Sequence, residues 1–111
     1  MSGSPEVAAI NAALRGATEL LGLQLTHDSG KYQLMLSLGR VENGKLAITL
    51  VCRDVQNFEL NPTGDGFEQL LHLHVEDLSS DGLDRIKFSI EELERETLFL
   101  HCSSIQVIRP A

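Results

Sequence analysis

The sequence predicts a single α+β domain in which an N-terminal helix packs on a mainly antiparallel sheet of about five to seven strands. Two observations support this fold class. Apolar residues recur at helical spacing near the N-terminus, and from residue 31 onward they alternate with polar ones, as in strands that bury one face. The short connections favour a meander, and they allow the sheet to curve into a partial barrel. A parallel, doubly wound sheet is disfavoured, because its strands would be apolar throughout.

The length and composition are those of one soluble domain spanning residues 1–111. Hydrophobic residues make up 42% of the chain and charged residues 23%, which is typical of a globular protein. No run approaches the roughly 18 apolar residues of a membrane span, and the start lacks the pattern of a signal peptide. We therefore expect a cytoplasmic protein with Cys52 and Cys102 as reduced thiols, although a bridge remains open if their strands are neighbours.

The helix is predicted to begin at Pro5 with Ser4 as its N-cap, because proline fits the first helical position, where its missing N–H costs nothing. An apolar stripe at helical spacing follows: Ile10, Ala13, Leu14, Ala17 and Leu21. The leucines of "LLGLQL" also alternate as they would in a strand. The end of the helix is therefore expected between Gly16 and Gly22.

A hairpin is predicted from "KYQLMLSLG" and "KLAITLVCR". A two-residue Asn-Gly loop would place the apolar faces of these strands on opposite sides of the sheet. A three-residue loop at 42–44 with a bulge instead sets Leu38 opposite Ile48 and Leu36 opposite Leu50. Hydrophobic matching therefore favours the bulged hairpin.

The remaining strands follow less regular patterns. We expect a strand or bent extension around Phe58, a strand over 67–78 and another at "DRIKFSI". The run "EELERE" fits either one helical turn or an acidic connection. In the last segment the apolar positions change phase at residues 103–104, which indicates a bulge or a short turn.

The charge balance indicates the kind of partner. Sixteen acidic residues against nine Lys and Arg give a formal charge of −7, and no stretch concentrates the basic residues. Nucleic acid and membrane surfaces are therefore not expected partners, whereas a basic protein is. An acidic balance is also ordinary for a soluble cytosolic protein of bacterial type.

In the absence of a catalytic motif, we expect a non-catalytic interaction module, monomeric or homodimeric. It would present a surface as toxin-neutralising immunity proteins and adaptors do, which is an analogy at the level of a class. No cofactor is expected, and an enzyme is the less favoured hypothesis. The candidate interaction residues are all acidic: Asp77, Asp81, Asp84, Glu91, Glu92, Glu94 and Glu96.

The segment "LLHLHVED" supplies the main alternative, a metal site. His72 and His74 share one face of a strand, because residues two apart point the same way. Two imidazoles could bind a metal ion together with His101 or Glu76 from the same face. A metal-dependent enzyme using His72, His74 and His101 is therefore the second hypothesis, and two solvated histidines are the simpler interpretation.

Residues 66–74 resemble the first half of the cupin motif, in which a glycine precedes a His-x-His pair on a barrel strand. The resemblance implies a metal-binding barrel. The glutamate that cupins carry four or five positions after the second histidine is replaced by Leu78 and Ser79, and the second cupin motif is absent around His101. A third hypothesis is a small-ligand carrier with an apolar pocket between the helix and the sheet.

Overall fold

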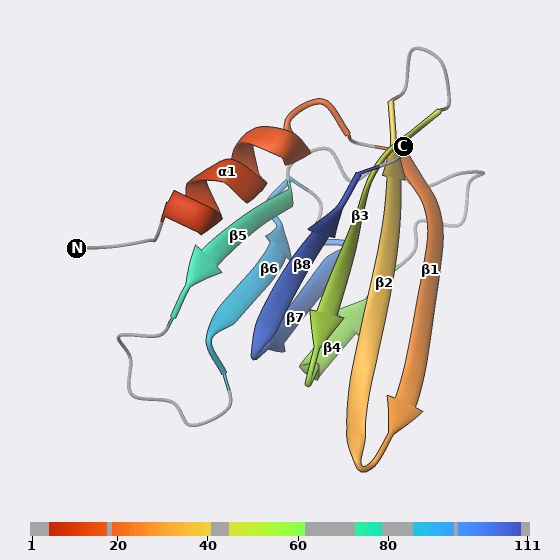
Figure 1. The fold of residues 1–111 in the computed structure, drawn as a ribbon, viewed down its shortest axis with the longest axis vertical. Coiled ribbons are helices and arrows are strands. Elements are labelled where there is room, and N and C mark those ends of the chain that lie inside the picture. The colour runs from red at the N-terminus through yellow and green to blue at the C-terminus, as the bar shows by residue number, and fades with distance from the viewer. Residues whose placement is uncertain are drawn as a thin grey trace.

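The computed structural model describes residues 5–17, 19–40, 45–61, 73–78, 86–94 and 96–109. Over these residues one helix and eight strands form an α+β fold (Figure 1). The elements are α1 (Pro5–Leu14), β1 (Glu19–Asp28), β2 (Lys31–Gly39), β3 (Leu46–Arg53), β4 (Gln56–Leu60), β5 (Leu73–Asp77), β6 (Phe88–Glu92), β7 (Leu98–Cys102) and β8 (Ser104–Ile108). No helix among the described residues is long and apolar enough to cross a membrane.

The strands form two antiparallel sheets instead of the single sheet that the sequence predicts. Sheet A has the order β1-β2-β3-β8, and sheet B has the order β4-β7-β6-β5. Their facing sides supply the core, whose largest fully buried apolar side chains are Leu34, Leu36, Leu38, Leu50, Ile90, Leu98, Leu100 and Val75. Closure of a sheet into a partial barrel is not observed over the described residues.

α1 begins at Pro5, as predicted, and ends at Leu14, two residues before Gly16. The strand interpretation of "LLGLQL" is confirmed, because β1 starts at Glu19 and places Leu21 in a strand, not on the helical stripe. Ser4 lies outside the described residues. The helix ends early because a ten-residue strand pairs with β2 and satisfies more backbone groups than another helical turn would.

The predicted register of the β2–β3 hairpin is confirmed. Leu38 pairs with Ile48 and Leu36 with Leu50, and the register shifts between Leu38 and Gly39. The four paired side chains are at most 2% exposed, so the match that predicted the register also builds the core. Residues 41–44, which include the predicted turn, lie outside the described part of the chain.

One antiparallel ribbon runs through both sheets. β3 continues into β4 through a bend at Asp54, and β7 continues into β8 through a bend at Ser103. The two bends are joined, because the Ser103 amide donates to the Arg53 carbonyl at 3.0 Å. Asp54 takes a left-handed φ of 57°, which aspartate tolerates better than most residues. The phase change predicted at 103–104 is this crossing between sheets.

α1 lies across one open side of the sandwich, beside the edge strands β5 and β8 (Figure 1). Its buried residues, Val7, Ile10 and Leu14, enter the core. The side chain of Asn11 pairs with the edge of β5: its Nδ2 donates to the Val75 carbonyl at 2.9 Å, and its Oδ1 accepts from the Val75 amide at 2.8 Å. The amide therefore takes the place of a neighbouring strand at this position.

Candidate functional site

His74 and His101 lie on the same face of sheet B, the outer face turned away from sheet A. The alternation of β5 and β7 buries their neighbours Leu73, Val75 and Leu100 on the inner face. β6 runs between the two histidines, with Glu91 opposite His74 and Ser89 opposite His101. His72 lies outside the described residues. Among those that are described, no three His, Cys, Asp or Glu side chains are grouped so that they could hold a metal ion.

His101 is engaged with its neighbours on this face. Asn57 Nδ2 lies 2.9 Å from His101 Nδ1, so the amide of β4 and the imidazole of β7 form a hydrogen bond across the two strands. The His101 and Phe99 rings also form a T-shaped pair, with centroids 4.9 Å apart and planes at 77°. His101 thus helps to orient Phe99.

Phe99 stands between two carboxylate-bearing residues in direct cross-strand register. Glu91 of β6 is opposite Phe99 of β7, which is opposite Glu59 of β4. Around this row lies a hollow of about 310 Å³, which we call the acidic hollow. Its lining consists of Glu59, Asn61, Glu91, Glu96, Leu98 and Phe99.

The segment that carries Glu96 is fixed at the rim of the hollow by backbone contacts. The Asn61 amide donates to the Thr97 carbonyl at 2.8 Å, and Asn61 Nδ2 donates to the Glu96 carbonyl at 3.5 Å. The Glu96 amide donates to Glu92 Oε1 at 3.1 Å. The short connection between β6 and β7 is therefore tied to the end of β4.

The carboxylates of the hollow have no internal counterion over the described residues. Neither Glu59, Glu91 nor Glu96 makes an ion pair or a side-chain hydrogen bond there. An aromatic face flanked by carboxylates is an arrangement that binds cations, since the ring quadrupole and both charges attract them. The hollow can therefore receive a guanidinium or an ammonium group.

The predicted acidic interaction residues separate into several environments. Glu91 and Glu96 line the hollow, and Glu94 is exposed in the turn after β6. Glu92 departs from the prediction, because it ends β6 on the inner face and is fully buried, with its carboxylate accepting the Glu96 amide. Its carboxylate stabilises the turn after β6, and no part of the side chain is exposed to a partner.

Asp77 ends β5 opposite Phe88 and is half-buried, and it does not line the acidic hollow. Asp81 and Asp84 lie outside the described residues. No motif in the sequence singles out Glu59 or Phe99. Strand alternation does place each on an outer face, but only the strand order β6-β7-β4 brings them beside Glu91.

Cys52 and Cys102 are neighbours. They are fully buried and come from opposite sheets, β3 and β7, and both are unbridged thiols. The hydrogen bond with Cys102 raises the pKa of the Cys52 thiol, and burial raises it further. A thiol held in its neutral form is a poor nucleophile, so the pair is part of the core. His101 points to the opposite face from Cys102, as predicted.

The comparisons with known proteins add no relative from which a role could be transferred. No family model, no curated protein and no solved structure matches the chain. The function is therefore argued from the site itself.

Proposed function

We propose that the protein is a non-catalytic interaction module, immunity- or adaptor-like, which acts in the cytoplasm and binds a basic protein segment at the acidic hollow. The observation that carries this proposal is the cross-strand row in which Phe99 stands between Glu91 and Glu59. Glu96 adds a third carboxylate at the rim. The overall charge of −7 would also steer a basic partner towards the protein.

The row favours an arginine over a lysine. A guanidinium is planar, so it can stack on the Phe99 ring while its edges donate to Glu91 and Glu59. A cation over a ring contributes about 0.5–2 kcal/mol, depending on its exposure, and an exposed ion pair contributes about 0.2–1 kcal/mol. One arginine is thus an anchor, and a stable complex requires further contacts around it.

The first test uses short peptides with a central arginine, lysine or citrulline, the last being a neutral analogue of arginine. Binding is followed by amide chemical shifts at Glu91 and Phe99. We expect the arginine peptide to bind most tightly and the citrulline peptide to cause no shifts there. Equal binding of the arginine and citrulline peptides would contradict the proposal.

The second test separates the hollow from the general acidity of the chain. The triple variant Glu59→Gln, Glu91→Gln, Glu96→Gln is compared with a variant that removes three acidic charges elsewhere: Glu19→Gln, Asp28→Asn and Glu76→Gln. We expect the first variant to bind the arginine peptide roughly tenfold more weakly than wild type, in keeping with the loss of charge-assisted contacts. The second variant should bind it less than twofold more weakly. The same loss in both variants would show that only the net charge matters. The two triple variants are then compared as baits in a pull-down of partners from native lysate.

A further inference from the structure

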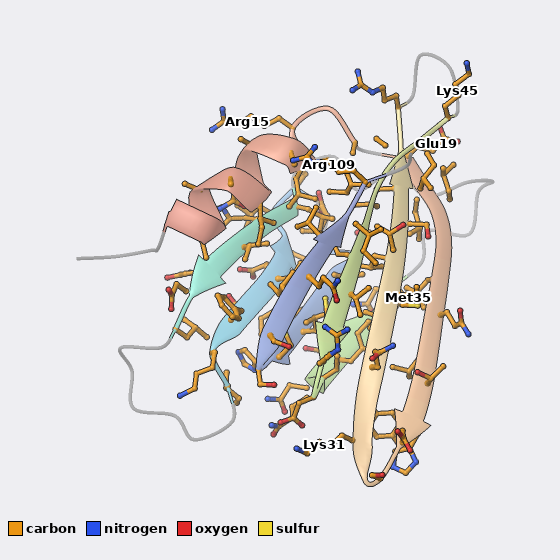
Figure 2. The ribbon with its side chains drawn as sticks, viewed as in Figure 1. Arg15, Glu19, Lys31, Met35, Lys45 and Arg109 are labelled. Carbon is orange, nitrogen blue, oxygen red and sulfur yellow. The ribbon has the colours of Figure 1, made fainter. Side chains whose placement is uncertain are left out.

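A second recess lies on another side of the molecule, between α1 and β8. It is an open groove of about 590 Å³ lined by Ala9, Ile10, Ile105, Gln106, Val107 and Arg109. Figure 2 shows Arg109 where β8 ends, beside α1. None of these residues lines the acidic hollow, so the two recesses are independent.

The groove lies on the side of α1 that faces β8, away from the contact with β5. Asn11 holds α1 to β5 through two hydrogen bonds, and the residue next to the groove on the helix, Ala9, has only a methyl group with which to reach β8. Ile10 and Ile105, which are 4% and 7% exposed, form the floor. The floor of the groove is thus the edge of the hydrophobic core.

The polar groups of the groove leave a positive charge at one end. Gln106 is engaged, because its Oε1 accepts from Arg53 Nη2 at 2.8 Å. Arg109 is exposed and makes no hydrogen bond or ion pair with any described residue. Among the described residues of the lining it is also the only charged one. The groove therefore combines an apolar floor with a guanidinium at one end that has no partner among the described residues.

We propose that this groove binds a fatty-acid-like carboxylate, with the alkyl chain along Ile10, Ile105 and Val107 and the carboxylate on Arg109. The methylene groups of the alkyl chain would pack on the apolar floor and so extend the hydrophobic core. The guanidinium of Arg109 would pair with the carboxylate through two parallel hydrogen bonds. A neutral lipid would leave the charge of Arg109 unused. A polar anion such as inorganic phosphate would leave the apolar floor exposed.

The test measures binding of octanoate, nonanoate and decanoate by calorimetry, with decanamide as a neutral analogue. Each added methylene should tighten the dissociation constant by about two- to fourfold, because about 0.8 kcal/mol, or fourfold, corresponds to a fully buried methylene and the groove is open on one side. Arg109→Gln should weaken decanoate by roughly tenfold, and decanamide should bind Arg109→Gln and wild type alike. The matched control Arg15→Gln, at an exposed arginine outside the groove, should leave the dissociation constant unchanged.

A second pair of variants tests the location. Ala9→Trp should fill the groove and abolish decanoate binding, whereas Ala12→Trp, at an exposed alanine of the same helix outside the groove, should not. Decanoate should shift the amide signals of Ile105 and Val107. No binding by wild type, equal effects of the two arginine variants or unchanged binding by Ala9→Trp would each overturn the proposal. Arginine-peptide binding at the acidic hollow should be unaffected by Ala9→Trp, so the two proposals fail separately.

Discussion

Asn11→Ala should be one of the most costly substitutions at a polar position in this fold. It removes both hydrogen bonds to Val75 and leaves an amide and a carbonyl of β5 without partners in a partly buried place. Each lost bond costs about 1–2 kcal/mol when the remaining group is poorly solvated. Alanine has a better helix propensity than asparagine and returns about 0.5 kcal/mol. The expected net loss in the free energy of unfolding is about 1.5–3.5 kcal/mol.

Two assays measure this loss. Urea denaturation gives the change in the free energy of unfolding, and native-state hydrogen exchange reports on the Val75 amide itself, whose hydrogen-bond acceptor is removed. Ala12→Asn, at an exposed position of the same helix, is the matched control, because it measures the difference in helix propensity without touching β5. A change below about 0.5 kcal/mol in Asn11→Ala, with Val75 exchange as slow as in wild type, would refute the assignment of Asn11 as the link between α1 and β5.

Three further predictions concern the core. The pKa of the Cys52 thiol is raised in the folded state, so the contribution of this thiol to the free energy of unfolding is fully present below the unfolded pKa of about 8.5 and falls by about 1.4 kcal/mol per pH unit above it. Cys52→Ala should therefore reduce the decrease in the free energy of unfolding between pH 7 and 10, measured by urea denaturation. A pH dependence unchanged by Cys52→Ala would contradict the assignment. Gly39→Ala places a Cβ 2.7 Å from Leu21 Cδ1 and 2.9 Å from the Lys45 carbonyl, so thermal denaturation should show a loss of about 1–3 kcal/mol; a variant as stable as wild type would refute the close packing. Leu36→Ala, at a fully buried position, should cost about 2–5 kcal/mol in urea denaturation, and a cost below about 1 kcal/mol would count against the register.

The sequence was sufficient for features that depend on adjacent parts of the chain. The β2–β3 register follows from matching two apolar faces, and Leu36 opposite Leu50 is its direct result. The start of α1 at Pro5 was predicted because proline fits the first helical position, whereas the expected end between Gly16 and Gly22 was wrong, since the helix ends at Leu14. The number of sheets was not predictable, because the crossing at Asp54 depends on Ser103, which lies about fifty residues further along the chain.

The site shows the same division. The alternation of apolar and polar residues along the strands correctly predicts that His74 and His101 point outward. It does not predict that β6 lies between them. Two residues of the hollow, Glu91 and Glu96, belong to an acidic run that is visible in the sequence, whereas Phe99 joins them only through strand order. The Asn11 link also left a weak signal, a polar residue beside the apolar stripe of a helix.

The ribbon that crosses between the sheets also sets the order in which the protein can fold. β8 belongs to sheet A with β1, β2 and β3, yet it follows every other described strand in the chain. During synthesis the first three strands therefore emerge with the edge of β3 unpaired until residues 104–108 have left the ribosome. Contacts of such long sequence separation slow folding to the millisecond-to-second range. Until β8 pairs with it, the edge of β3 can pair with a strand edge of another chain, which is a route to aggregation.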